Sequence, residues 1–301
     1  MKKFLTLLLA LMLGVATVFG LVGCNSGDEG DDYSGRVKYI DVKLSEESYG
    51  IAVSKTDASL LATVNEVLEE KATEIEALFT KYEDVDETDA SLKVDGVVTY
   101  TDAMANNDAY LVMATDAPFA PYEYTVGNGY AGIDIEIGKM IATKLGKTLA
   151  IKQTAFDTIC TVVNQGGADI GLAGLTITPA RKNTVNFSNP YYEEAYQVIV
   201  VPEEVTKFDN KTAEEIVEIL KGLKKGTKVG SQNGTTGAKY IQGDIDDPEG
   251  FGFEGYSNLT LKTYTTHADA VRDMVNGEVE LCIVDNAVAA SIVSQINAAI
   301  R

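Results

Sequence analysis

Short apolar runs alternate with stretches of helical periodicity from Tyr110 onward, and this alternation restricts the fold more than any other feature of the sequence. The helical stretches cover residues 133–145, 156–164 and 212–223, with another between His267 and Gly277. The apolar runs cover residues 111–114, 149–151, 168–172, 198–201, 229–230 and 281–284. Strands that alternate with helices predict mainly parallel sheets with helices on both faces, so we expect an α/β fold.

A weak internal repeat divides this part of the chain into two halves. Residues 156–175 and residues 267–288 both run from a helix through a Gly and an acidic residue into an apolar strand. The repeat predicts two similar lobes. Open α/β sheets bind ligands at the carboxyl ends of their strands, so we expect those ends to face a shared cleft.

The charge balance and the scarcity of metal-binding side chains exclude some classes of function. Lys and Arg total 25 against 45 Asp and Glu, which gives a net charge of −20. Phosphates would repel such a chain, so we expect no nucleic acid as a partner. One His and three Cys form no zinc pattern, and we expect neither a metal nor a cofactor. We expect Cys160 and Cys282 to be buried thiols; a bridge between them stays open.

The N-terminal residues indicate a targeting signal. In residues 1–23, Lys2 and Lys3 precede an apolar stretch, 4–20, that is short for a membrane span. The Leu-Val-Gly-Cys ending at Cys24 resembles the bacterial lipobox, which implies that Cys24 is acylated and becomes the mature N-terminus. The alternative is an ordinary signal peptide with an incidental Cys. Residues 24–36 are rich in Gly, Ser and Asp and predict a flexible tether. We therefore expect an extracytoplasmic protein that is anchored to the cell membrane.

Several short motifs occur in a fixed order between residues 110 and 299. The strongest are Thr-x-Thr-Pro-x-Arg at residues 176–181 and Ser-Asn-Pro-Tyr-Tyr at residues 188–192. They are accompanied by Thr-Asp-Ala-Pro-Phe at 115–119, Gly-Ile-Asp at 132–134 and Gly-Thr-Thr-Gly at 234–237. This ordered set resembles the family 3 solute-binding proteins of amino-acid ABC transporters.

The resemblance implies a fold and a function. The fold would be the two-lobed type II periplasmic-binding-protein-like fold, in which a two-strand hinge joins the lobes. The function would be to capture a free amino acid, more readily a polar one, and to deliver it to an ABC transporter permease by hinge closure. The protein would act as a monomer.

A zwitterionic amino acid needs an anion site, and three residues suit that role. Arg181 offers a planar fork that matches a carboxylate in two parallel hydrogen bonds. Thr176 would add its backbone N–H and its hydroxyl. Thr236 stands where a Gly-rich turn leads into a helix, and free N–H groups at a helix start attract anions. The alternatives are a surface Arg and a plain turn.

The ammonium and the side chain of the ligand need their own groups. Gly174 would bring a main-chain carbonyl close to the ammonium. Asp285 matches the acid of the family pattern, and a helix N-cap is its alternative. Phe119 and Phe156 match the two flat walls of the family's pocket, although core packing is the usual place of Phe.

Two further polar residues are assigned to the pocket. Asp116 could accept a hydrogen bond from a polar or basic ligand side chain, or it could bond backbone N–H groups of its own turn. Gln232 could line the pocket from the second lobe, and a solvated loop position is its alternative.

Residues 37–82 resemble the usual C-terminal segment of the family, yet here they precede the body. They predict strands at 37–42 and 49–53 and a helix at 57–82, followed by a polar connector at 83–107. This order predicts a circular permutation. Lobe 1 would then be residues 44–200, including the connector, and lobe 2 would be residues 37–43 with 201–301. The alternative is an unrelated N-terminal module.

Two other functions use the same scaffold. A small-molecule lyase would need catalytic groups, but we find no nucleophile or acid–base pair and predict no catalytic residue. His267, the single histidine, stands near a helix start, where we expect a capping or solvated role. A ligand-sensing module that docks a receptor is the other alternative.

Overall fold

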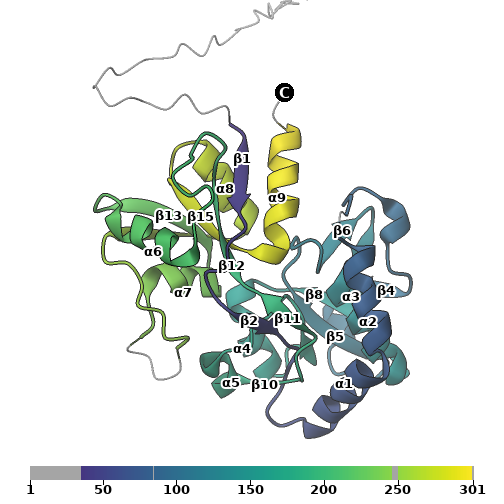
Figure 1. Ribbon diagram of the computed structural model, residues 1–301. Coiled ribbons are helices and arrows are strands. Elements are labelled where there is room, and N and C mark those ends of the chain that lie inside the picture. Colours follow the sequence, from purple (N-terminus) through teal and green to yellow (C-terminus); the bar gives the residue numbers. More distant parts are fainter. Residues whose placement is uncertain (1–34, 84, 246–249, 300–301) are drawn as a thin grey trace, which may run out of the picture. The chain divides into compact units, whose positions relative to one another are not determined.

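The computed structural model describes residues 35–83, 85–245 and 250–299. The expected signal peptide, Cys24 and the expected tether up to residue 34 lie outside these ranges. The described residues form two larger sheets, each covered by helices (Figure 1). Within the same ranges, no helix combines the length and the apolar character that a membrane crossing requires.

The first sheet, which we call the lobe 2 sheet, has five strands in the order β1-β12-β15-β13-β14. One side of it is parallel, because β13 pairs with both β14 and β15 in parallel register. The other two pairings, β1 with β12 and β12 with β15, are antiparallel. The strands are β1 (Val37–Ile40), β12 (Gln197–Pro202), β13 (Thr227–Gln232), β14 (Leu259–Tyr264) and β15 (Leu281–Asp285).

The second sheet, the lobe 1 sheet, has six strands in the order β10-β3-β9-β5-β8-β4. β4, β8, β5 and β9 pair in parallel, whereas β3 and β10 add an antiparallel edge. The strands are β3 (Ala52–Val53), β4 (Val97–Thr99), β5 (Tyr110–Thr115), β8 (Thr148–Gln153), β9 (Ile170–Gly171) and β10 (Asn186–Phe187). A small hairpin of β6 (Tyr124–Val126) and β7 (Gly129–Ala131) stands beside this sheet.

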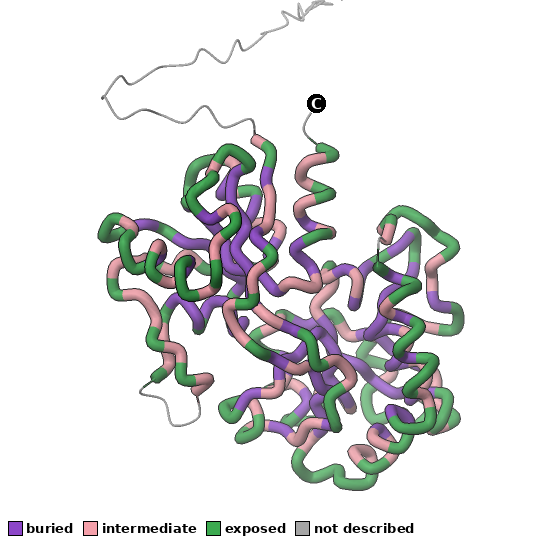
Figure 2. The backbone as a smooth tube through the Cα atoms, viewed as in Figure 1, coloured by how far each residue is buried: buried purple, intermediate pink, exposed green. Residues whose placement is uncertain are grey.

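Helices cover both sheets, and most of them bury one side against the core (Figure 2). In α6, for example, the Thr212 hydroxyl and the Glu215 carboxylate form a capping box, and Ile216 and Leu220 pack into the core. The helices are α1 (Ala58–Glu70), α2 (Ala72–Lys81), α3 (Ile133–Lys144), α4 (Ile159–Asn164), α5 (Pro179–Thr184), α6 (Ala213–Gly222), α7 (Thr236–Gln242), α8 (His267–Val275) and α9 (Asn286–Ala299). Short 3₁₀ turns occupy Ala90–Leu92, Asp102–Met104 and Phe156–Thr158.

Two segments of the described chain cross between the lobes, and they pair with each other. β2 (Glu47–Tyr49) follows β1 on the way to lobe 1, and β11 (Tyr192–Ala195) precedes β12 on the way back. They run antiparallel, with Tyr192 opposite Tyr49 and Ala195 opposite Glu47. This two-stranded ribbon is the hinge region, and its side chains reach the space between the sheets.

The segment 37–82 is divided between the two lobes. β1 pairs with β12 along its whole length, and Val37 exchanges two hydrogen bonds of 2.8 Å with the side chain of Asn297 in α9. In lobe 1, Val64 and Val67 of α1 share a core cluster with Ile137 of α3. The segment is therefore an integral part of both cores.

Several local expectations differ from the structure. The single helix over 57–82 is wrong, because Lys71 (φ −106°, ψ 11°) interrupts it and lets α2 turn its own apolar face to the core. The strand at 49–53 is split into β2 in the hinge and β3 in lobe 1. The helix expected from 156 begins as a 3₁₀ turn. The connector 83–107 contributes β4 to the sheet edge.

The sheets are also more mixed than the expected mainly parallel ones. The antiparallel strands lie next to the two crossings of the hinge in the sequence. β1 and β12 join the lobe 2 sheet, and β3 and β10 join the lobe 1 sheet, outside the regular alternation of strands and helices. All of β12 lies in the lobe 2 sheet. Residues 197–200 therefore belong to lobe 2, although the sequence placed them in lobe 1, which was expected to end at residue 200.

Candidate functional site

The residues assigned from the sequence lie at strand ends that meet between the two sheets. Asp116 follows β5, and Thr176 stands five residues after β9 in lobe 1. Gln232 and Asp285 are the last residues of β13 and β15 in lobe 2. Both sheets therefore present carboxyl ends of parallel strands to one interface between the lobes, which we call the cleft and which is the usual ligand position in open α/β sheets.

Arg181 spans the cleft from the first turns of α5. Its Nη1 donates to the Thr176 carbonyl at 2.8 Å, and its Nη2 donates to the Gly234 carbonyl of the other lobe at 3.1 Å. The guanidinium stacks on the Phe156 ring, 5.0 Å from its centroid. α5 is set by Thr178, whose hydroxyl caps the N–H of Arg181. Arg181 is thus a half-buried fork held over an aromatic face and not a free surface Arg.

The two assigned threonines converge on a carboxylate that the sequence did not single out. Thr176 and Thr236, from opposite lobes, donate their hydroxyls to Oε2 of Glu47 at 2.8 and 2.7 Å. Glu47 lies in β2 and is 6% exposed. Its Oε1 accepts from Ser45 at 2.7 Å and from Gln197 at 3.1 Å. Burial raises the pKa of Glu47, as does the neighbouring charge of Asp285, and the hydroxyl donors offset only part of this rise.

Asp285 lies at the same floor of the cleft. Its Oδ1 accepts from the Tyr49 hydroxyl at 2.8 Å and from Gln197 Nε2 at 3.0 Å, and His267 Nε2 lies 3.4 Å from its Oδ2. Burial alone would raise the pKa of Asp285, but these donors hold it below its ordinary value. Asp285 is the last residue of β15 and directly precedes α9.

The expectation for His267 was wrong. The side chain is 2% exposed, and its ring lies 5.8 Å from the ring of Phe119. The helix cap is supplied by Thr266, whose hydroxyl accepts the Asp269 N–H. Because Thr266 takes the cap, the first side chain of α8 is free to point into the cleft.

Asp116 and Gln232 meet across the cleft. Gln232 Nε2 donates to Asp116 Oδ2 at 2.8 Å, and the Phe156 N–H donates to the same oxygen at 3.2 Å. Burial raises the pKa of Asp116 to about 6, against hydrogen bonds from Phe156 and Gln232. Gln232 is buried, so it is not the solvated loop residue of the alternative expectation.

Gly174 adopts a backbone conformation that favours glycine. Its φ is +53°, and a Cβ there would lie 2.7 Å from Cε1 of Phe119, so main chain and aromatic wall are in direct contact. The Gly174 N–H donates to Asp134 at 3.0 Å. Burial raises the pKa of Asp134 to about 7. The nearby buried Glu123 has a pKa raised well above its ordinary value, by burial and by the charge of Asp134.

Four residues of this cleft were missed by the sequence reasoning or misplaced by it: Glu47, Tyr49, Gln197 and His267. One feature of the sequence could have indicated Glu47 and Tyr49: they lie at or just before the start of the expected strand 49–53, in the segment that resembles the family's C-terminal segment. Gln197 and His267 carry none, since an amide before an apolar strand and a His at a helix start are ordinary.

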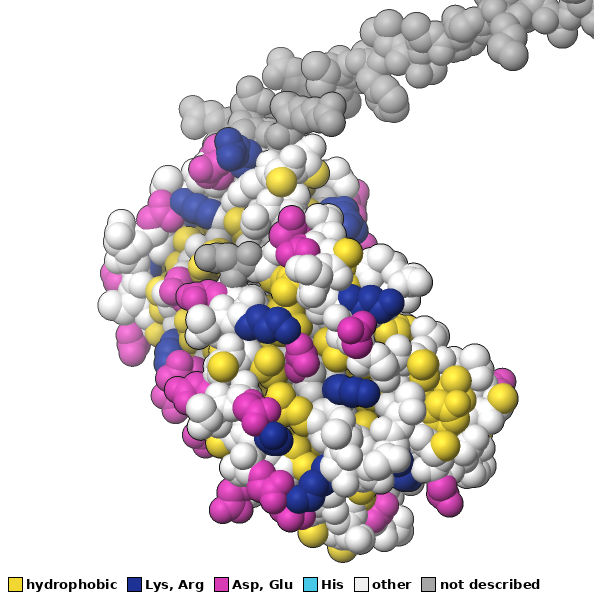
Figure 3. Space-filling model, turned by 90° about the vertical axis from the view of Figure 1, so that its right-hand side faces the viewer, with side chains coloured by type: hydrophobic (Ala, Val, Ile, Leu, Met, Phe, Trp, Pro, Cys, Tyr) yellow, Lys and Arg dark blue, Asp and Glu magenta, His cyan; other side chains and the backbone are white. Residues whose placement is uncertain are grey.

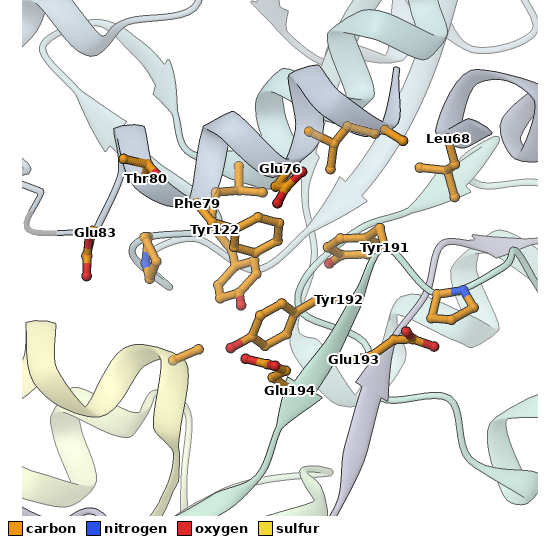
Figure 4. Close-up of a pocket in the computed structure, with 16 residues that line it drawn as sticks. Leu68, Glu76, Phe79, Thr80, Glu83, Tyr122, Tyr191, Tyr192, Glu193 and Glu194 are labelled. Atoms are coloured by element: carbon orange, nitrogen blue, oxygen red, sulfur yellow. The ribbon is translucent and has the colours of Figure 1, made fainter. Parts of the chain in front are cut away.

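A separate cavity of about 820 Å³ lies behind the cleft, between α2, the hinge strand β11 and the start of α9 (Figure 4). Its floor is aromatic, with Phe79 and Tyr192 stacked at 5.0 Å. Around that floor stand Glu76, Glu83, Glu193 and Glu194. Tyr122 joins the cavity to the cleft, because its ring lies 5.7 Å from that of Phe119. None of the assigned ligand residues lines this cavity.

Of the two thiols expected to be buried, only Cys282 is fully buried. Figure 3 shows basic and acidic side chains interspersed over one face instead of gathered by sign. Cys282 is buried and Cys160 is half-buried; both are free thiols, so the bridge left open is not formed. In the described ranges, no group of three or more His, Cys, Asp or Glu is arranged to hold a metal ion.

Two α/β lobes, a paired-strand hinge, and a cleft lined by an Arg fork and buried carboxylates define a ligand-binding protein of the two-lobed periplasmic type. The model of the bacterial extracellular solute-binding proteins, family 3, matches residues 111–282, and the chain belongs to this family. The expected fold class is confirmed.

Curated relatives and solved structures match part of this chain. The arginine-binding extracellular protein ArtP of Bacillus subtilis (strain 168) is 29% identical over 60% of this chain and 62% of its own. A probable histidine-binding protein of Neisseria gonorrhoeae is 30% identical over 63% of each chain. The solved structure of an ancestral arginine-binding protein bound to arginine is 33% identical, covers 62% of this chain and 74% of its own, and gives a TM-score of 0.52. The chain thus spans less than two thirds of the length of these two curated relatives.

Proposed function

We propose that this protein captures a free amino acid outside the cytoplasm, closes its lobes on it, and delivers it to an ABC importer as a monomer. The observation that carries the proposal is the placement of Arg181 and Asp285. One is a guanidinium fork from lobe 1 and the other is a buried carboxylate from lobe 2, and they face one cleft. This pair complements the carboxylate and ammonium of an amino acid. The names of the relatives, which are binding proteins and not enzymes, support the same function.

The charges of the cleft favour a ligand with a basic side chain. Glu47, Asp116 and Asp285 contribute three carboxyl groups, while Arg181 is the one Arg or Lys that bonds there among the described residues. A ligand carboxylate would match Arg181, and a ligand ammonium would match Asp285. Asp116, beside Phe119 and Phe156, is then left for a cationic side chain. Arginine is the ligand in the structure of the ancestral relative, and we place it first among candidates.

A thermal-shift screen of the common amino acids tests this function, because a ligand that binds the native state raises Tm by mass action. We expect arginine to raise Tm most, followed by other basic or polar amino acids. Small-angle scattering with the same ligand should show compaction as the hinge closes. Absence of any Tm increase would refute amino-acid binding, and turnover of the ligand by the pure protein would favour an enzyme instead.

We further propose that the chain is a circular permutation of the family order. β1 lies in the lobe 2 sheet, whereas β3, α1 and α2 pack in lobe 1, as a C-terminal segment returning through the hinge would. Val37 and Asn297 are joined by two hydrogen bonds, so the two ends of the described fold lie side by side. The lobes would be residues 44–196 and residues 37–43 with 197–301.

Restoring the family order tests the permutation. The variant begins at residue 85, so that β4 is kept, runs to residue 299, and continues through a short Gly-Ser linker into residues 36–83. We expect it to fold and to bind the same amino acid within a few fold of the parent affinity. A variant of this order that is unfolded by circular dichroism would contradict the proposal.

The lipobox-like sequence supports a proposed lipid anchor at Cys24. We expect metabolic palmitate labelling of the expressed full-length chain and its recovery in the membrane fraction. Cys24→Ala should lose the label and appear in the soluble extracytoplasmic fraction. Equal labelling of both chains would overturn the assignment.

A further inference from the structure

Glu47 occupies an unusual place for a buried carboxylate. It belongs to the hinge strand β2, and no Lys, Arg or His among the described residues forms an ion pair with it. Four neutral donors surround it instead: three hydroxyls and one amide. Two of the hydroxyls are those of Thr176 and Thr236, the residues assigned to the ligand from opposite lobes.

The charge of Glu47 fixes the direction of these two hydrogen bonds. In its ionised form, which a ligand ammonium in the cleft favours, Glu47 only accepts, so each threonine turns its single hydroxyl proton toward Glu47. A hydroxyl whose proton is committed can only accept from a ligand. Thr176 Oγ1 is bonded to no donor in the described part of the chain, so its lone pairs remain available.

The same unit extends to the assigned ammonium partner. Nε2 of Gln197 donates to Glu47 at 3.1 Å, to Thr236 Oγ1 at 3.1 Å and to Asp285 at 3.0 Å. This amide has two protons for three acceptors, so one proton is shared, and it holds two carboxylates and a threonine hydroxyl together at the floor of the cleft. This floor presents acceptors and negative charge, which suits a group that donates several hydrogen bonds and carries positive charge.

We propose that Glu47 is a positioning residue that makes the site selective for ligands with an α-ammonium group, by holding the hydroxyls of Thr176 and Thr236 as acceptors toward the cleft. The inference rests on the proposed amino-acid binding and deepens it. Arg181 and the backbone N–H groups recognise the carboxylate of the ligand, and Glu47 acts only through the threonines on its ammonium. Removing the charge of Glu47 should therefore weaken binding of the ligand's ammonium and leave binding of its carboxylate unchanged.

The test compares one amino acid with the same molecule lacking its ammonium, for which arginine and 5-guanidinopentanoate are the pair. In Glu47→Gln, the amide can donate to one threonine and reverse its hydroxyl. We expect arginine to bind at least about 10-fold more weakly, and 5-guanidinopentanoate to change by less than about 2-fold. The matched control is Glu46→Gln, the exposed neighbour with the same chemistry, which should change neither affinity.

A purely structural role for Glu47, as a latch between the lobes, predicts a different result. Loss of a latch would weaken both ligands by the same factor, and that outcome would overturn the proposal while amino-acid binding stands. If wild-type protein binds no amino acid, the proposed function fails and this inference falls with it. If Glu47→Gln does not fold, Thr176→Val serves instead, since it deletes the acceptor oxygen and keeps the backbone N–H. It should weaken arginine alone, and Thr176→Ser should restore the affinity; equal losses for both ligands in Thr176→Val would again overturn the proposal.

Discussion

Replacing Arg181 by Ala is the most direct test of the anion site. In the structure the guanidinium donates to the carbonyls of Thr176 and Gly234 and stacks on Phe156. A ligand carboxylate would take over one face of this fork. The side chain is held from below by the aromatic ring, so it needs little reorganisation to bind.

The size of the effect follows from the bonds that are exchanged. Two charge-assisted hydrogen bonds to a carboxylate contribute about 3–6 kcal/mol, and giving up two main-chain bonds costs about 1–3 kcal/mol. The middle values of these two ranges differ by about 2.5 kcal/mol, so we expect Arg181→Ala to bind roughly 60-fold more weakly. Arg181→Lys keeps the charge but not the fork, so it should fall between wild type and Ala.

Isothermal titration calorimetry with the best ligand of the screen measures these affinities, and circular dichroism verifies that each variant is folded. The matched control is Lys182→Ala, an exposed cation one position further along α5, which should leave affinity unchanged. Unchanged affinity in Arg181→Ala, or equal losses in Arg181→Ala and Lys182→Ala, would refute the assignment of the anion site.

Three further predictions address the rest of the cleft. Asp285→Asn should weaken an amino acid much more than its deaminated analogue, and equal losses in calorimetry would show that Asp285 does not meet the ammonium. Because the pKa of Asp116 is raised to about 6, protonation below pH 6 removes its charge. The affinity for arginine should then fall up to tenfold per pH unit between pH 6 and 5 in wild type but not in Asp116→Asn, and parallel profiles would contradict this. Gly174→Ala should lower the free energy of unfolding in urea by about 1–3 kcal/mol, more than Gly166→Ala, because both have positive φ but only Gly174 would place a Cβ against Phe119; equal losses would count against that contact.

The sequence alone was sufficient to predict the class of fold and the approximate bounds of the regularly alternating strands and helices. Helical and strand periodicities depend on residues close in the chain, so α3, α6, β5 and β15 could be predicted within a few residues. Arg181, Thr176 and Asp285 could be named because they match motifs of the family that the sequence resembles, and because they stand near strand ends, which lie at the same edge in a parallel sheet.

Other features depended on contacts between distant parts of the chain. Glu47 and Thr236 are 189 residues apart, and the two strands of the hinge bring them to 2.7 Å. Nothing in the local sequence around Gln197 or His267 distinguishes them from an amide and an imidazole on the surface. The break at Lys71 likewise follows from the direction in which α2 must turn to bury its apolar face.

The chain therefore determined by itself which segments are strands and helices and which residue types could recognise an amino acid. Only the tertiary structure decided that the recognition groups rest on a buried carboxylate of the hinge. The physical reason is that local propensity acts over a few residues. Burial and hydrogen-bond partners, by contrast, are fixed only when both lobes pack around the hinge strands β2 and β11.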